Sequence, residues 1–219
     1  KKSYNTTMQK NLILIDDHKM IIYGLKCYIQ HHSAWSVLFT AASKTELLQN
    51  LSEYKESFFS ESEEVQNIAL IDIKVGDSDG YELCRLVKEQ IPGIHCIMYS
   101  MYSTYGNIMY AFESGAEGFL SKEADENELI LALDAVSSGK VYIQQDLMKT
   151  VLVNSNKMSL LTRREKQIFD LLINNEEKKA ICQELKITIH TLENYLSILY
   201  SKLEVQDMEE LKKKYGGKV

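Results

Sequence analysis

Three carboxylates stand where apolar segments of the chain end. Asp16 and Asp17 follow the run NLILI, and Asp72 closes the run IALID. Carboxylates that are brought together repel one another and need a cation, and oxygen-only ligands suit Mg2+, which keeps some waters and usually accompanies phosphate oxygens. An aspartate held against Mg2+ can attack a phosphoryl group and form an acyl phosphate. These residues therefore predict metal-assisted phosphoryl chemistry on an aspartate.

Two residues further along the chain could complete such a site. Ser100 ends the run IHCIMYS, where its hydroxyl could donate to a phosphoryl oxygen, and Lys122 follows GFLS, where its ammonium could pair with the carboxylate or the phosphate. Taken singly, Asp16 or Asp17 could cap a helix, Ser100 could be a turn residue, and Lys122 could be a solvated charge. Their shared position at strand ends favours one functional site.

The elements that must position these residues form a repeating pattern. Five short apolar runs, typical of buried strands, alternate with helical patterns. This α/β pattern predicts a five-stranded parallel doubly wound (flavodoxin-like) sheet, in which the first and third strands are neighbours and chemistry gathers at the carboxyl ends of the strands. The expected strands are 11–15, 35–42, 68–72, 94–100 and 118–121, and the expected helices are about 19–31, 44–57, 79–90, 103–114 and 125–138.

The pattern changes after a polar segment near 144–158, which we interpret as a linker. Beyond it no strand pattern remains, and Thr162 and Glu165 have the spacing of a capping box. A short helix, a tight turn and a longer helix then predict a helix-turn-helix. The predicted organisation is an α/β domain at 9–143, the linker, and an all-α domain of about four helices at 159–219. Three of these helices are expected at about 178–186, 189–203 and 207–214. Within the α/β domain, residues 60–66 are expected to form an exposed acidic loop.

Composition narrows the remaining possibilities. No apolar run approaches the ~18 residues that span a bilayer, and the polar start KKSYNTTMQKN does not resemble a secretory signal, so we expect a cytoplasmic protein with no membrane partner. The four cysteines are far apart and suggest neither disulfides nor zinc. The net charge of −6 divides into −8 over residues 1–154 and +2 over 155–219. The tail is therefore the better, though weakly basic, candidate for binding an anionic partner.

Several motifs resemble a known family. LILIDDH, ALIDIKVGDSDGYEL, IMYSMYS and GAEGFLSKEAD closely resemble the receiver domain of bacterial response regulators. LLTRREKQIFDLL and the helices behind it resemble the LuxR-type helix-turn-helix of the NarL/FixJ group, so the resemblance covers about 11–211. It implies a two-component response regulator that is not an enzyme beyond self-catalysed phosphoryl transfer and slow autodephosphorylation. The implied partners are a sensor histidine kinase, double-stranded DNA and, after phosphorylation, a second copy in a homodimer.

The resemblance also implies roles for the acidic cluster. Asp72 would be the phosphoacceptor, and Asp16, Asp17 and Asp72 would bind Mg2+ together with the backbone carbonyl of Lys74. The family usually has Met-Pro where this chain has Val-Gly directly after Lys74. Because proline restricts the backbone, its absence predicts a more mobile loop.

The later strand ends receive roles in sensing the phosphoryl group. The resemblance implies that Ser100 and Lys122 contact that group, and that Phe119 is an aromatic switch which turns inward when Ser100 moves toward the phosphate. Rival enzyme classes lack their motifs. A haloacid-dehalogenase phosphatase needs a second aspartate two residues after Asp72, where this chain has Lys74. There is also no GxxxxGK[ST] or GxGxxG loop, and Ser100 has no recognisable histidine base.

The predicted recognition helix carries an unusual charge for a DNA-binding surface. Glu193 stands where the family commonly has lysine, a change that removes about one counterion-releasing contact and lowers the salt slope by roughly 0.9. Yet glutamate can accept a hydrogen bond from cytosine, and Asn194 can pair with adenine. Two outputs therefore stay open: a DNA-binding transcription regulator, or a phosphorylation-controlled protein-interaction module whose helix-turn-helix binds DNA weakly or not at all.

The helical period separates the two faces of this helix. Apolar residues at three- and four-residue steps are expected to face the core, namely Ile189, Leu192, Leu196, Leu199 and Leu203, while His190, Glu193, Asn194, Ser197 and Ser201 point away. The candidate DNA-binding residues are Lys178, Lys179, Thr188, Thr191, Glu193, Asn194, Ser197 and Lys202, with Arg163, Arg164 and Lys166 as further candidates for phosphate contacts.

Overall fold

The computed structural model describes residues 9–58, 65–174 and 176–217. The described residues form two compact units, one made of those up to 102 with 110–144, the other of 103–109 with those from 145 onward. The acidic stretch expected to be an exposed loop lies mostly outside the described residues. Among the helices that the structure does describe, none is long and apolar enough to cross a membrane.

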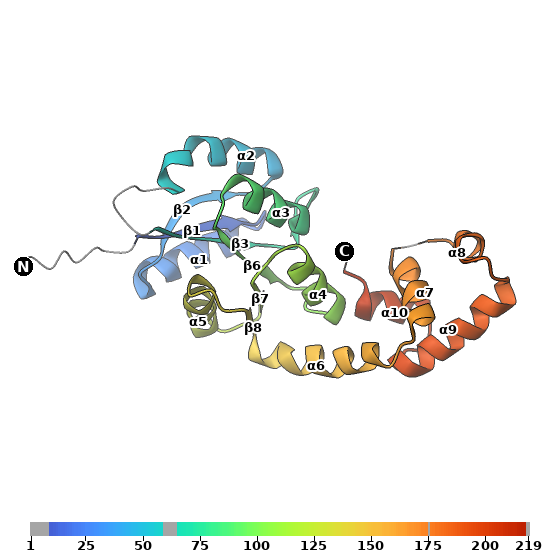
Figure 1. Cartoon of the computed structure of the whole chain (residues 1–219). Helices are drawn as coiled ribbons and strands as arrows, with labels where there is room; N and C mark the ends of the chain where they lie inside the picture. The colour runs from blue at the N-terminus through green and yellow to red at the C-terminus, as the bar shows by residue number, and fades with distance from the viewer. Residues whose placement is uncertain (1–8, 59–64, 175, 218–219) are drawn as a thin grey trace, which may run out of the picture. The chain divides into compact units, whose positions relative to one another are not determined.

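The first unit is built on a six-stranded parallel sheet (Figure 1). Its order, β2-β1-β3-β6-β7-β8, makes β1 and β3 neighbours, as the doubly wound pattern predicts. The expectation of five strands missed β8, whose two residues are too few to show a strand pattern. The strands are β1 (Gln9–Ile15), β2 (Ser36–Ala41), β3 (Val65–Ile71), β6 (His95–Ser100), β7 (Gly118–Ser121) and β8 (Tyr142–Ile143).

Helices cover both faces of this sheet. Figure 1 shows α2 and α3 on one side and α1 and α5 on the other. Three helices begin at side-chain caps, because Ser43, Asp79 and Asp125 each accept a hydrogen bond from a backbone N–H in the first turn. The helices of this unit are α1 (Lys19–His32), α2 (Lys44–Glu53), α3 (Gly80–Gln90) and α5 (Glu126–Ser137), with a 3-10 turn at Lys55–Phe58. A further helix, α4 (Tyr105–Glu113), belongs to this unit only from residue 110 onward.

A small antiparallel hairpin follows β3, formed by β4 (Lys74–Val75) and β5 (Ser78–Asp79). Gly76 at its tip has a φ of +58°, in the left-handed region that favours glycine. At Gly80, a Cβ atom would lie 1.9 Å from the carbonyl oxygen of Asp72, so α3 can begin this close to β3 only at a glycine. The greater mobility expected for this loop stays a prediction.

The second unit is helical, as expected for the tail. Thr162 and Glu165 form the predicted capping box, in which the Thr162 side chain accepts from the Glu165 N–H and the Glu165 carboxylate accepts from the Thr162 N–H. The helices are α6 (Gln145–Ser159), which covers most of the segment expected to be a linker, α7 (Arg163–Ile173), α8 (Lys178–Leu185), α9 (Ile189–Leu203) and α10 (Met208–Tyr215).

One face of α9 supplies much of the core of this unit. Its buried residues, Leu192, Leu196, Leu199 and Leu203, follow the helical period as predicted. Ile189 was expected among them, and this prediction is wrong, because its side chain is 49% exposed. Ile189 is the first residue of α9 and lies at the edge of the apolar stripe.

Candidate functional site

Asp16 and Asp72 lie side by side because β1 and β3 pair in register. Ile15 pairs with Ile71 at the end of both strands, and the Asp72 N–H donates to the Ile15 carbonyl at 2.9 Å. Asp16 and Asp72 are both only 5% exposed, whereas Asp17 is exposed. The two strand ends therefore bring together the carboxylates that the sequence singled out.

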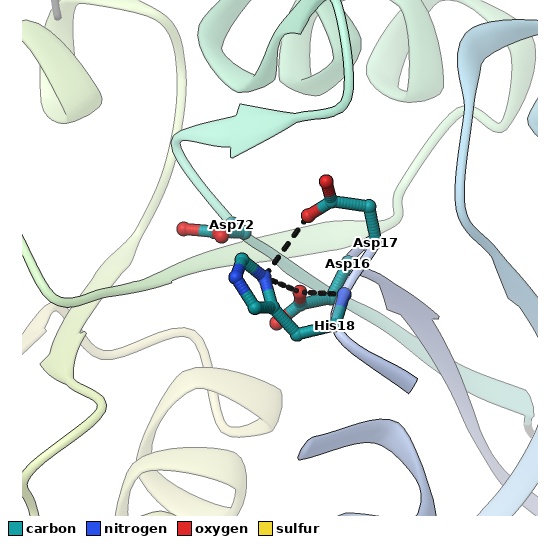
Figure 2. Close-up of side chains that lie close together, drawn as sticks. All are labelled: Asp16, Asp17, His18 and Asp72. Carbon is teal, nitrogen blue, oxygen red and sulfur yellow. Dashed lines mark hydrogen bonds and ion pairs between the residues drawn. The ribbon is translucent and has the colours of Figure 1, made fainter. Parts of the chain in front are cut away.

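A histidine completes the cluster (Figure 2). Ligand atoms of Asp16, Asp17, His18 and Asp72 all lie within 4.8 Å of one another. His18 Nδ1 is 3.0 Å from Oδ1 of both Asp16 and Asp17, and the His18 N–H donates to Asp16 Oδ1 at 2.8 Å. Sequence reasoning gave His18 no role, although its position directly after two candidate ligands was a signal.

Lys122 is buried between two of these carboxylates. Its Nζ lies 2.7 Å from Asp72 Oδ2, to which it donates a hydrogen bond, and 2.6 Å from Asp16 Oδ2. Lys122 therefore forms an ion pair with each of the two buried carboxylates. The Lys122 side chain is 3% exposed, which rules out a solvated charge.

The cluster keeps an excess of negative charge. Three carboxylates and one ammonium leave a formal charge of −2, which is the charge that one divalent cation neutralises. Burial, and after it the charge of Asp16, raises the pKa of the nearby Tyr99 hydroxyl above its ordinary value. The donor set therefore fits a hard cation such as Mg2+.

An open pocket of about 410 Å³ gives solvent access to this cluster. The Ser100 side chain reaches the pocket, and its Oγ accepts from the Tyr102 N–H at 3.2 Å. Phe119, in the neighbouring strand β7, is fully buried. The pocket is lined by Asp17, His18, Ile21, Asp72, Lys74, Ser100, Met101, Tyr102 and Lys122.

Gln144, which directly follows β8, is hydrogen-bonded to β7, the strand that directly precedes Lys122. Its Oε1 accepts from the Ser121 N–H at 2.8 Å, and its own N–H donates to the Phe119 carbonyl at 3.1 Å. Ser121 directly precedes Lys122. The sequence gave no signal for Gln144, because its partner belongs to a strand more than twenty residues away.

The helix-turn-helix has a short, well-capped turn. Lys186 ends α8 in the left-handed conformation, with a φ of 54°. Thr188 caps α9 by accepting from the Thr191 N–H at 3.1 Å, and the two hydroxyls lie 2.8 Å apart. As predicted, the outer face of α9 is exposed, with His190, Glu193, Asn194, Ser197 and Ser201.

Two of the candidate DNA-binding cations are engaged inside their own unit. Lys202 Nζ lies 2.9 and 2.8 Å from the two carboxylate oxygens of Glu165, and Arg164 Nη2 donates to the Leu185 carbonyl at 2.6 Å. Burial alone would raise the pKa of Glu165, but hydrogen bonds from Lys202 and the Thr162 cap outweigh it and lower that pKa. The other candidates, Arg163, Lys166, Lys178 and Lys179, are exposed.

Comparison with known proteins matches both parts of the chain. Residues 12–134 match the response regulator receiver domain, and residues 159–213 match the bacterial regulatory proteins of the luxR family. Transcriptional activator protein ExaE of Pseudomonas putida is 28% identical over 208 residues, covering 91% of this chain and 92% of that protein. Response regulator protein VraR of Staphylococcus aureus is 24% identical, covering 91% of this chain and 93% of that protein.

A solved structure shares the fold of nearly the whole chain. It is RcsB from Salmonella enterica serovar Typhimurium bound to a promoter in the presence of the phosphomimetic BeF3-, with a TM-score of 0.68 and 19% identity over 95% of this chain and 98% of that one. The receiver match alone covers more than half of the sequence, and the luxR match covers most of its helical tail. The protein therefore belongs to the response regulators that join a receiver domain to a LuxR-type regulatory domain.

Proposed function

We propose that this protein is a transcription regulator whose DNA binding is controlled by phosphorylation of Asp72. The observation that carries the proposal is the position of Asp72, buried at the end of β3, bonded to Lys122 and opening onto the pocket. We assign residues 9–143 to the receiver, 144–158 to a linker and 159–219 to DNA binding. RcsB, similar in fold, was solved bound to a promoter, which supports a DNA-binding output.

The phosphoryl donor in this proposal is a phosphohistidine of a sensor kinase. The Asp72 carboxylate attacks phosphorus, the phosphorus–nitrogen bond breaks with its electron pair left on the imidazole, and an acyl phosphate forms. Asp72 is both the nucleophile and the residue that keeps the phosphoryl group, so the chain needs no separate substrate site. Slow hydrolysis of the acyl phosphate by a water in the open pocket would return Asp72 to its starting state.

The acidic residues would hold a divalent cation, Mg2+, beside Asp72. Asp16 and Asp72 would bind it with Asp17 and the Lys74 carbonyl, and the clustering of the three carboxylates supports this role. When bound, Mg2+ would offset the charge of the incoming phosphoryl oxygens. His18 lies against the same carboxylates and would have to turn aside to admit the ion.

Ser100 and Lys122 would report phosphorylation to the rest of the receiver. Lys122 now binds Asp72 Oδ2, and after phosphorylation it would donate to a phosphoryl oxygen instead. Ser100 would exchange its contact with the Tyr102 N–H for a bond to the phosphate. Phe119 is already fully buried here, so an inward turn on phosphorylation requires an unphosphorylated conformation in which its ring is more exposed.

For the output, α9 would lie in the major groove. Lys178 and Lys179 would contact phosphates with Thr188 and Thr191 near the helix start, while Glu193, Asn194 and Ser197 would face base edges. The Lys202 ammonium is held by Glu165, so we propose that its contribution is to fix α9 against α7. Two copies on a repeated half-site would raise affinity through effective concentration.

One observation favours the alternative output, a protein-interaction module. Among the described residues, the exposed face of α9 carries Glu193 and no lysine or arginine. Selection from a random pool of duplex DNA with the phosphorylated protein separates the two outputs. Enrichment of a sequence at low salt supports DNA reading, and failure to enrich any sequence favours the interaction module.

The phosphoacceptor itself is tested by Asp72→Asn. Incubation with acetyl phosphate and Mg2+ should give the wild type a hydroxylamine-sensitive phosphoryl group, detected by intact mass, and should leave Asp72→Asn unlabelled. Asp77→Asn is the matched control, because Asp77 is an exposed carboxylate on the adjacent hairpin and should leave labelling intact. Undiminished labelling of Asp72→Asn would contradict the assignment.

A further inference from the structure

The exposed side of α9 has an apolar side chain on its first turn. The buried stripe against the core is formed by Leu192, Leu196, Leu199 and Leu203, but Ile189 is 49% exposed. Ile198 is also exposed, at 42%, two and a half turns further along the helix. An exposed isoleucine gains free energy when another surface covers it, so Ile189 is a candidate for a contact between α9 and a partner.

The position of Ile189 indicates which partner that is. Residues at the N-terminal end of a recognition helix contact base edges in the major groove. Ile189 is the first residue of α9, directly after the Thr188 cap, and Glu193 follows it one turn later on the same side. Both side chains are exposed, so on a helix lying in a major groove they would face neighbouring positions of that groove.

The groups that bases present in the major groove indicate which base Ile189 would contact. Of the four bases, thymine alone presents a methyl group in the major groove, and apolar side chains contact that methyl. Isoleucine is β-branched and loses little rotamer freedom when it is covered, which suits a fixed apolar contact. The carboxylate of Glu193, in contrast, can accept only from a donor such as the cytosine amino group.

We propose that Ile189 reads the methyl group of a thymine next to the base pair that Glu193 contacts. This inference rests on the DNA-binding output proposed above and assigns it a further specificity-determining residue. The exposed face of α9 would then select its DNA site through the apolar contact of Ile189 and the hydrogen bond accepted by Glu193. A basic helix would use lysine contacts instead.

The first test changes the DNA and leaves the protein unchanged, by removing the thymine methyl group. A duplex enriched from the random pool is prepared with each thymine replaced singly by deoxyuridine, which lacks only that methyl. Binding of the phosphorylated full-length protein is measured by fluorescence anisotropy. At one position the replacement should lower the affinity of the wild type about fourfold, the value expected for one buried methyl group.

The protein variants decide whether Ile189 makes this contact. Ile189→Ser should bind the thymine duplex about as weakly as the wild type binds the deoxyuridine duplex, and it should no longer distinguish the two. Ile198→Ser is the matched control, because it removes an exposed isoleucine from the far part of the same helix and should keep the discrimination.

Three results would overturn the proposal. The wild type could bind all the deoxyuridine duplexes equally well, or Ile189→Ser could discriminate as strongly as the wild type. Ile189→Ser could also change the oligomeric state in sedimentation without any effect of deoxyuridine, which would place a second copy of the chain on Ile189. In each case a sequence has been enriched and the DNA-binding output stands, whereas a pool without enrichment removes that output and the proposal together.

Discussion

Replacing Lys122 by methionine removes the ammonium that separates two buried carboxylates. Breaking a buried ion pair from one side typically costs about 3–5 kcal/mol, because the remaining charge stays buried without compensation. Here two carboxylates, both only 5% exposed, would face each other, so we expect the upper part of that range. Lys140→Met is the matched control, since Lys140 is exposed in the same unit and its loss should cost less than about 0.5 kcal/mol.

Magnesium should reverse part of this loss. The ammonium competes with a cation for Asp16 and Asp72, so its removal should tighten Mg2+ binding. An ion present at a hundred times its dissociation constant stabilises the folded state by about 2.7 kcal/mol. The benefit of Mg2+ should therefore be larger for Lys122→Met than for the wild type.

Urea unfolding followed by tryptophan fluorescence measures both effects. Trp35, the one tryptophan of the chain, is buried in the first unit and therefore reports the unfolding of that unit. Each protein is unfolded in excess EDTA and again with Mg2+. The reasoning is refuted if Lys122→Met and Lys140→Met unfold at the same urea concentration in EDTA, or if Mg2+ stabilises the wild type more than Lys122→Met.

Two further substitutions test the second unit. The folded pKa of Glu165 lies below its ordinary 4.5, so its ionised form stabilises the fold at pH values above about 4.5, and this contribution is lost as the pH falls through the folded pKa. Glu165→Gln should flatten that acid dependence in calorimetric scans of the full chain, and parallel curves for the two proteins would contradict the ion pair. Glu193→Lys should tighten binding to duplex DNA and steepen the salt dependence by about 0.9 in anisotropy titrations, and an equal change in Glu209→Lys, on α10, would contradict the placement of α9 at the DNA.

The sequence was most informative at the strand ends. Asp72 and Lys122 lie fifty residues apart, yet the alternation of apolar runs and helical patterns was enough to place both at the same edge of a parallel sheet. The capping box at Thr162 was equally predictable from the sequence, because it depends on residues three positions apart. Local periodicity and short spacing, together with the family resemblance, therefore predicted the sheet order and the acidic cluster.

Features that depend on tertiary packing could not be predicted from the sequence. The strand β8 is too short for a pattern, and the bond between Gln144 and Ser121 joins strands that only the folded sheet brings together. Lys202 was predicted as a DNA-binding residue, and its ion pair with Glu165 could not be foreseen because the two residues lie on different helices. Ile189 fits the apolar period of α9, yet this first residue of the helix is exposed in the folded structure.

The central claim is that phosphorylation of Asp72 controls DNA binding. Its most direct test is the affinity of the full-length protein for an enriched duplex, measured by anisotropy before and after treatment with acetyl phosphate and Mg2+, in the wild type and in Asp72→Asn. We predict that treatment tightens DNA binding by the wild type and by Asp77→Asn but leaves DNA binding by Asp72→Asn unchanged. An equal gain in Asp72→Asn, or an unchanged affinity of a wild-type protein shown by mass to be phosphorylated, would contradict it.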